Sequence, residues 1–221
     1  MSGTIKAWSF SAWKGWKQCA FQFKMRRVLK LKEPVSPILE RGSEVHDEAA
    51  AYLLGKAKKL PTSLKQFTTA YEELRAKKPE VEMRLAFDKS WKPVDDFFGP
   101  TVWMRCVIDA LVIEGAHATV VDHKTSKPKE IFEEQLELNA ISVFLRWPKV
   151  KTVSTELWYV DHGIVMPIPR VTYQRKDLAS HKAKWKKRVT PMLNDKSFRP
   201  NPSYLCRYCH FRKDNDGPCE Y

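Results

Sequence analysis

Two aspartates and a lysine stand at a spacing that suits metal-dependent hydrolysis. Asp109 lies in an apolar segment, and Asp122 and Lys124 follow it in the pattern Asp-x12-Asp-x-Lys. Residues i and i+2 of a strand share a face, so Asp122 and Lys124 are expected to project the same way. Two carboxylates in apolar surroundings are costly unless a cation compensates them, and Mg2+ or Mn2+ is the matched ion. A metal bound there could activate water for attack on a phosphate. The simpler alternative is that Asp122 and Lys124 form a structural ion pair.

His46 is a third candidate for this site because of its place on a predicted helix. The helix is expected over residues 43–60, with Ser43 as its N-cap. Apolar residues follow His46 at i+3, i+4 and i+7, which directs the imidazole toward the interior. Spacing leaves two interpretations open, a histidine satisfied within the core and a neutral imidazole that binds the same metal.

Four of the five cysteines are candidates for a second metal centre. Cys206, Cys209 and Cys219 lie in a Pro-containing C-terminal segment, and Cys-x2-Cys spacing lets two thiolates reach one centre. A fourth ligand is required, and the candidates are Cys19 for an iron–sulfur cluster and His210 for a Zn2+ site. In a third interpretation no metal is bound, and Cys19 packs as a small hydrophobic residue.

The charge balance indicates a polyanionic partner. Lys and Arg number 39 against 26 Asp and Glu, which gives a net charge of +13. Nucleic acid is the first candidate and an anionic membrane the second, whereas a solvated Lys-rich face is the simplest alternative. We find no stretch approaching the ~20 apolar residues of a membrane helix and no signal peptide. The sequence therefore predicts a cytoplasmic protein with reduced cysteines and no membrane partner.

Basic and aromatic residues near both ends of the chain are candidates to bind DNA. Cations that track phosphates beside aromatic stacking platforms suit single strands or frayed ends. For each aromatic residue the alternative is packing in the core. The candidates are Lys14, Trp16, Lys17, Lys184 and Lys187.

The elements that must position these residues are expected to form a single domain over residues 1–221. Short helices are expected within 8–30. Alternating and apolar segments predict strands at 80–88, 102–113, 118–124, 152–160 and 164–172, and helical spacing predicts helices at 63–77, 130–146 and 175–194. This order predicts an α/β (α+β) fold with a mixed β-sheet flanked by helices.

Four sequence features together resemble the PD-(D/E)xK nuclease superfamily. They are the segment RGxxVH that ends at His46, the letters IDA around Asp109, the segment VVDHKT with Asp122 and Lys124, and a helix that opens QLEL at Gln135. Within the superfamily, the chain is most similar to the RecB-like branch of CRISPR-associated and phage exonucleases. The resemblance runs from about residue 10 to residue 219.

The resemblance implies a restriction-endonuclease-like fold and a set of site residues. It implies metal binding by His46, Asp109, Asp122 and the His123 carbonyl, catalysis by Lys124, a place for Gln135 near the active site and DNA, and contact of Arg41 with DNA. Two positions depart from the family pattern. Asn139 stands where the family has Tyr, and Cys106 stands where it often has Gly.

The function implied by the resemblance is that of a metal-dependent DNA exonuclease with two Mg2+ or Mn2+ ions. It would act on single-stranded DNA or DNA ends in phage or bacterial recombination, replication or repair, beside an annealing protein or a helicase. A structural four-iron four-sulfur cluster on Cys19 and the three C-terminal cysteines would join residues 1–35 and 196–221 as a subdomain. The alternatives are a catalytically silent DNA-binding accessory protein, an RNA-directed nuclease and an endonuclease.

Overall fold

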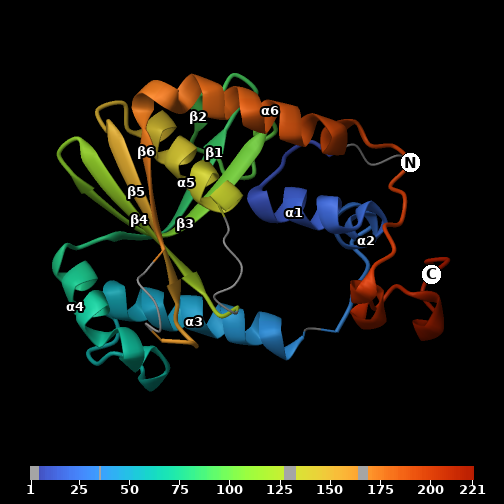
Figure 1. The fold of residues 1–221 in the computed structure, drawn as a ribbon, viewed down its shortest axis with the longest axis horizontal. Helices are drawn as coiled ribbons and strands as arrows, with labels where there is room; N and C mark the ends of the chain where they lie inside the picture. The colour runs from blue at the N-terminus through green and yellow to red at the C-terminus, as the bar shows by residue number, and fades with distance from the viewer. Residues whose placement is uncertain (1–4, 35, 127–132, 164–168) are drawn as a thin grey trace.

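The protein is built around a six-stranded β-sheet with helices on both faces (Figure 1). The computed structural model describes residues 5–34, 36–126, 133–163 and 169–221. The helices are α1 (Phe10–Gln18), α2 (Ala20–Phe23), the π-helix η1 (Lys24–Val28), α3 (Pro37–Leu53), η2 (Thr62–Phe67), α4 (Thr68–Ala76), α5 (Glu133–Arg146), η3 (Arg175–Asp177), α6 (Leu178–Asn194), η4 (Tyr204–Tyr208) and η5 (Lys213–Asn215). The strands are β1 (Glu80–Phe87), β2 (Pro93–Val94), β3 (Met104–Glu114), β4 (His117–Lys124), β5 (Thr152–Tyr159) and β6 (Arg170–Gln174).

The strand order is β2-β1-β3-β4-β5-β6, and among the strands in the described residues only β4 and β5 pair in parallel. A tight turn at Gly115, whose φ of 62° suits glycine, joins β3 to β4. The parallel pair requires a crossover, and α5 supplies it. The predicted mixed sheet flanked by helices is therefore confirmed.

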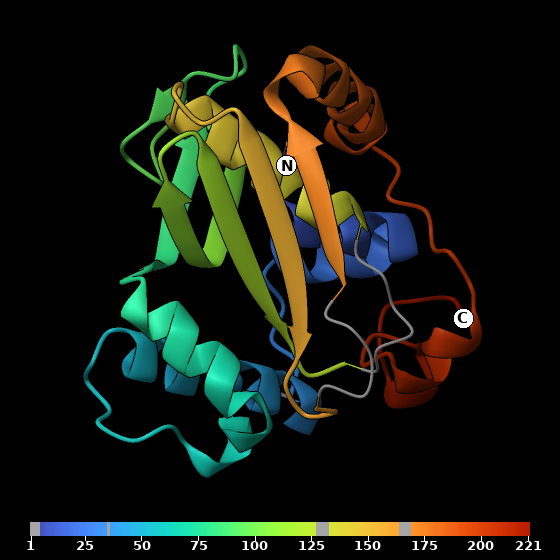
Figure 2. The same ribbon diagram turned by 60° about the vertical axis from the view of Figure 1, so that its left-hand side comes forward.

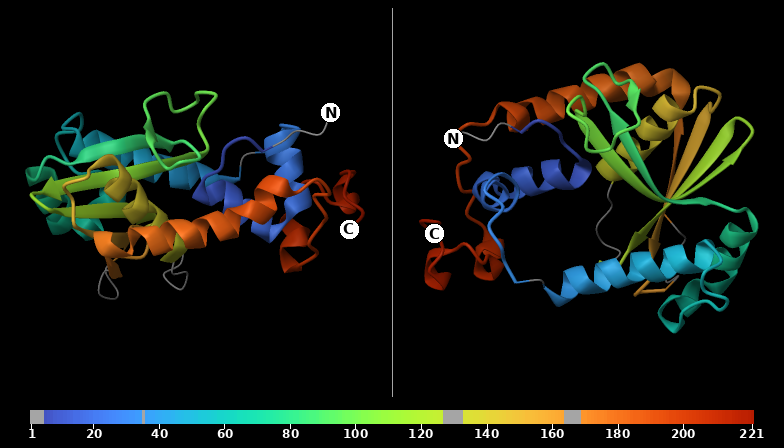
Figure 3. Two further views of the ribbon diagram at one scale, coloured as in Figure 1. Left: turned by 90° about the horizontal axis from the view of Figure 1, so that it is seen from above. Right: turned by 180° about the vertical axis from the view of Figure 1, so that it is seen from behind.

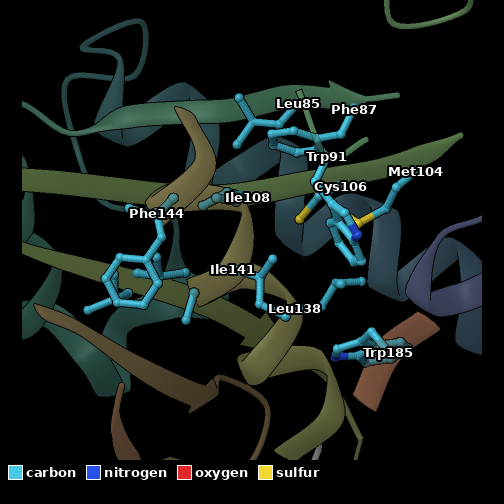
Figure 4. Close-up of a cluster of buried hydrophobic side chains, with 14 of the residues drawn as sticks. Leu85, Phe87, Trp91, Met104, Cys106, Ile108, Leu138, Ile141, Phe144 and Trp185 are labelled. Atoms are coloured by element: carbon cyan, nitrogen blue, oxygen red, sulfur yellow. The ribbon is translucent and has the colours of Figure 1, made fainter. Parts of the chain in front are cut away.

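Two hydrophobic layers fix the helices to the sheet. Figure 2 shows the ribbon of the sheet and of the helices around it. One layer holds α5 and α6 against the sheet through residues such as Ile108, Ile141 and Phe144 (Figure 4). The other holds α3, η2 and α4 against the opposite face. Helix α5 is buried on nearly all sides because it lies between the sheet and α6.

The N-terminal helices are tied to α6 and to the C-terminal segment, at the end of the molecule away from the sheet (Figure 3). Trp8 stacks on Trp185 of α6 with ring centroids 5.3 Å apart, and Trp13 meets the same ring edge-on at 5.2 Å. The side chain of Gln22 donates a hydrogen bond to Cys209 Sγ at 3.2 Å. These contacts bring residues 1–35 and 196–221 together where both are described, and their separate folding as a subdomain stays a prediction.

The start of α3 differs from the sequence-based expectation. The helix begins at Pro37, and Ser36 is its N-cap, accepting from the Leu39 N–H at 3.4 Å. The prediction of Ser43 as N-cap was wrong because Pro37 suits the first helical position and Ser36 before it caps the helix. Parts of the predicted helix 130–146 and strand 164–172 lie outside the described residues. Within the described chain, no helix has the length and apolar character to cross a membrane.

Replacing Trp185 with alanine is expected to lower the free energy of unfolding by about 3–5 kcal/mol. The side chain is fully buried and contacts both Trp8 and Trp13, so its removal opens a cavity between α6 and the N-terminal segment. Urea denaturation measures the change. The exposed neighbour Lys186→Ala is the control, with an expected effect within about 0.5 kcal/mol. A loss for Trp185→Ala as small as the control would contradict this account.

Candidate active site

Asp109 and Asp122 face each other across the β3–β4 hairpin. The hairpin pairs Ala110 with Val121, so the two aspartates are the next cross-strand neighbours along the same register. Both are buried, Asp122 to 2% exposure. Two carboxylates this close in the interior repel one another and lose hydration, so the surrounding groups must compensate them.

Asp122 is compensated by a closed ring of polar contacts with Lys124 and Gln135. Lys124 Nζ lies 2.6 Å from Asp122 Oδ2 and donates to Gln135 Oε1 at 2.9 Å. Gln135 Nε2 donates to Asp122 Oδ1 at 2.6 Å. Asp122 and Lys124 reach the same side of β4 because they are two residues apart, and α5 presents Gln135 to that side. The structure thus brings these three predicted site residues into direct contact.

The negative charge of Asp109 is compensated mainly by a backbone N–H group. The N–H of His123 donates to Asp109 Oδ2 at 2.7 Å, and His46 Nδ1 lies 3.4 Å from the same oxygen. Burial raises the pKa of Asp109 to about 7, and the negative charge of Asp122 adds to the shift. A divalent cation beside both carboxylates would remove this penalty.

His46 projects from α3 to the edge of the site and is held by Glu82, a residue that the sequence analysis did not single out. His46 Nδ1 lies 3.4 Å from Glu82 Oε1. The hydrogen bond to Glu82 raises the pKa of His46 to about 8, with a contribution from the charge of Asp109. Glu82 has a left-handed backbone with φ of 50°, which is strained for a residue with a side chain. Its only sequence signal was an acidic residue within an alternating strand.

The strand pairing explains the position of Glu82. The register pairs Val81 with Ala110 and Met83 with Ile108, which sets Glu82 opposite Asp109. Val81 and Ala110 belong to the layer under α3, whereas Met83 and Ile108 belong to the layer under α5. Along both strands, the buried side chains therefore switch from one face of the sheet to the other at Glu82 and Asp109. These two residues line the same cavity.

The sequence expectation for His123 concerned its carbonyl, but the structure directs attention to its ring. The imidazole points to the opposite side of β4 from Asp122, stacks on Tyr71 with centroids 5.6 Å apart, and has no hydrogen-bond partner on either nitrogen. Burial lowers its pKa to about 3, so the ring is neutral. Ligand atoms of His46, Asp109 and His123 all lie within 4.8 Å of one another. An unpartnered neutral imidazole beside a carboxylate fits a metal site.

Cys106 and Asn139, the two residues that depart from the family pattern, contact each other. The thiol of Cys106 lies 3.3 Å from Asn139 Oδ1 on α5 and donates to it. Burial raises the pKa of Cys106 to about 12, so the thiol keeps its proton. The residue pair therefore forms a neutral polar contact next to the carboxylates, where the family pattern has a small residue and an aromatic one.

The cysteines predicted as cluster ligands are only partly brought together. Cys19, Cys206 and Cys209 line one cavity of about 30 Å³, while Cys219 does not line it. Gln22 occupies part of the space between the sulfurs through its bond to Cys209. Within the described ranges, no three cysteine sulfurs are close enough to share a single ion. The present arrangement is therefore not a closed ligand set for a four-iron four-sulfur cluster or for Zn2+.

The predicted DNA-binding residues lie in separate places. Arg41 on α3 forms a 2.6 Å ion pair with Asp161. Lys184 on α6 pairs with buried Glu137 at 2.9 Å, and Trp16 on α1 donates to Asp195 at 2.7 Å. The remaining candidates, Lys14, Lys17 and Lys187, are exposed on α1 and α6. Their contact with DNA stays a prediction.

Nothing in the sequence indicates the cavity that adjoins the carboxylates. It has a volume of about 460 Å³ and reaches from His46, Asp109 and Gln135 to the loop between β2 and β3. The loop contributes Phe97 and Phe98, and β3 contributes Arg105. Alternation could place Arg105 on a strand, but nothing in the sequence links it to the site.

Comparison with known proteins assigns the fold and site to a class. The sequence matches the model of the PD-(D/E)XK nuclease superfamily over residues 7–213, so the chain belongs to this superfamily. The predicted superfamily is confirmed, and the protein stands among hydrolytic nucleases, whose substrate is nucleic acid. The RecB-like branch stays a prediction.

Two solved structures are similar to the chain. One is described as "Putative exonuclease" from Eubacterium rectale, with 14% identity, a TM-score of 0.53, and coverage of 94% of this chain and 88% of that chain. The other is SSO0001, with 15% identity, a TM-score of 0.43, and coverage of 94% and 84%. The first likeness shows a shared fold. No curated protein matches the sequence.

Affinity for Mn2+ is expected to rise with pH. Asp109, with a pKa of about 7, and His46, with a pKa of about 8, must lose their protons to coordinate a cation. Protons therefore compete with the metal as the pH falls through these values, and binding should be at least about tenfold tighter at pH 8 than at pH 6. Titration calorimetry on the metal-free protein measures this. Asp109→Asn should weaken binding and flatten the dependence, and equal affinity at both pH values would contradict the site.

Proposed function

We propose that the protein is a metal-dependent deoxyribonuclease that degrades DNA as an exonuclease, with preference for single strands or ends. The observation that supports it best is the contact ring of Asp122, Lys124 and Gln135 opposite buried Asp109. A purely structural Asp–Lys pair would not need a second buried carboxylate across the hairpin. The net charge of +13 fits a polyanionic substrate.

In this proposal the side chains of His46, Asp109 and Asp122 hold Mg2+ or Mn2+, together with the carbonyl of His123. Such ions, when bound, neutralise phosphate charge and make water a stronger nucleophile. Lys124 stands beside the carboxylates, where its ammonium can orient the attacking water and its neutral amine can take a proton from that water. Gln135 fixes Lys124 Nζ and Asp122 Oδ1 in one geometry through its amide. Burial of the two aspartates keeps bulk water from competing for these contacts.

We further propose that Cys19, Cys206, Cys209 and Cys219 bind a structural metal centre, a four-iron four-sulfur cluster or Zn2+. Three of them already line one cavity between α2 and η4. Binding would require Gln22 to give up its hydrogen bond to Cys209. It would also require Cys219 to move toward the other three cysteines. The setting proposed for the enzyme is cytoplasmic recombination, replication or repair of phage or bacterial DNA, with a helicase or annealing protein as partner.

Asp122→Ala or Lys124→Ala is expected to abolish DNA degradation while the protein stays folded. Loss of Lys124 removes the group next to the nucleophile, and a positioned proton-transfer group contributes about 10²–10⁴-fold in rate. The measurement is the release of nucleotides from 5′- and 3′-labelled single- and double-stranded DNA with Mn2+, with EDTA as the control. Lys58→Ala, which alters an exposed lysine in the loop after α3, is the matched control and should retain full activity.

The same assay separates the alternatives. Degradation by both active-site variants at the rate of the unaltered protein would refute the assignment. Complete inactivity of the unaltered protein on every nucleic acid would favour an accessory DNA-binding role. Parallel reactions with labelled RNA and with closed circular DNA distinguish RNA-directed and endonucleolytic cleavage from exonuclease action.

Protein purified without oxygen is expected to be brown and to contain iron and sulfide, because thiolates at this spacing bind iron–sulfur clusters. Metal and sulfide analysis measures the content. Cys19→Ser should lose the metal if Cys19 is a ligand, whereas Cys106→Ser, which alters the buried fifth cysteine, should retain it. Colourless protein with stoichiometric zinc would identify the Zn2+ alternative, and metal-free protein would refute both.

A further inference from the structure

The cavity beside the carboxylates has an aromatic rim that the chemistry described above does not use. Phe98 is 71% exposed and lines the same cavity as Asp109 and Gln135. Phe97 meets it edge-on with ring centroids 5.0 Å apart. A large exposed aromatic side chain at the mouth of an active site offers a flat surface to a ligand.

The loop holds this surface in a defined position. The Phe98 N–H donates to Asp96 Oδ1 at 3.0 Å, and the Gly99 N–H donates to the Asp96 carbonyl at 3.1 Å. A Cβ atom at Gly99 would lie 3.1 Å from the Asp96 side chain, so the turn is tightly packed there. Arg105 Nε donates to the Phe97 carbonyl at 2.8 Å, which ties the loop to β3. The exposure of Phe98 is therefore a consequence of a closed hydrogen-bonded turn.

Arg105 adds a positive charge to the same surface. Its guanidinium lies 5.1 Å from the centre of the Phe98 ring and 5.7 Å from that of Phe97. An aromatic ring with a cation at its side is suited to a nucleotide, since the ring can stack on a base while the cation approaches the phosphate. A base paired within a duplex presents no free face, so this surface requires an unpaired base.

A second cavity continues from the first. It has a volume of about 560 Å³ and shares Ser9, Arg27 and Arg105 with the cavity at the active site. It is also lined by Lys6 and Lys30, which do not line the cavity at the active site. Among the residues that the structure describes, no carboxylate pairs with Arg27, Lys6 or Lys30. The charges along this groove are therefore available to a bound polyanion, unlike those of Arg41 and Lys184, which already pair with carboxylates.

We propose that the two cavities form the binding path of a single DNA strand, with Phe98 as the stacking platform for the base next to the cleaved phosphate. Arg105 and Arg27 lie where the path leaves the active site, and Lys6 and Lys30 bind phosphates further along. This inference rests on the proposed nuclease function and deepens it, because it assigns the preference for unpaired strands to particular residues.

The stacking contact is tested by combining a protein variant with a substrate variant. Phe98→Ala should weaken binding of a fluorescent single strand about tenfold, the loss typical of one base–aromatic contact. A set of strands, each with one abasic position, is measured in EDTA to prevent cleavage. When the missing base is the one that stacks on Phe98, the strand should bind the unaltered protein and Phe98→Ala about equally. Tyr208→Ala is the matched control, since Tyr208 is also 71% exposed beside an arginine but lines neither cavity.

The phosphate contacts are tested by salt dependence. Each phosphate contact to a single strand contributes about 0.7 to the slope of log affinity against log salt, so Lys6→Ala/Lys30→Ala should lower the slope by about 1.4. Lys58→Ala/Lys59→Ala removes two exposed lysines elsewhere and should leave the slope unchanged. Equal slopes for both double variants would overturn the path.

The outcomes separate the path from the function on which it rests. If Phe98→Ala lowers the affinity for every abasic strand as much as for the intact strand, or not at all, the stacking platform is wrong. If this occurs while Asp122-dependent cleavage of DNA persists, only the path is refuted. If the unaltered protein neither binds nor cleaves DNA, the proposed function fails and the path fails with it.

Discussion

The interaction on which the site depends is the repulsion between two buried carboxylates across the β3–β4 hairpin. Asp109 and Asp122 are held close by the strand register and cannot move apart without breaking the sheet. Each is compensated by a different means, Asp122 by Lys124 and Gln135, and Asp109 by a backbone N–H and by His46. The raised pKa of Asp109 shows that this compensation is incomplete without a cation. The hairpin thus provides the two carboxylates that would bind a divalent metal in the proposed function.

This constraint explains why helices are needed on both faces of the sheet. Successive residues of β4 project to opposite sides, so Asp122 and Lys124 meet α5 while His123 meets the layer of α3 and α4. The crossover helix α5 supplies Gln135, and α3 supplies His46. The site therefore lies at the junction of two cores, and an error in the packing of either would displace part of it.

Sequence reasoning succeeded where a local rule governs the outcome. The spacing of Asp109, Asp122 and Lys124 follows from strand alternation and a short hairpin, and both are readable from the chain. It failed where tertiary packing decides, as for Glu82, whose strained backbone depends on its partner strand, and for Phe98, whose exposure depends on a turn closed by Asp96. The ring of His123 was missed because its place is set by Tyr71, which is distant in the chain.

The left-handed backbone of Glu82 has a consequence for how this protein can change. The conformation costs about 1–3 kcal/mol for a residue with a side chain, and glycine would adopt it freely. Glycine would, however, leave His46 without the carboxylate that holds it. The stability of the fold and the position of His46 therefore make opposite demands on residue 82, so a substitution that relieves the backbone strain would release the imidazole from β1.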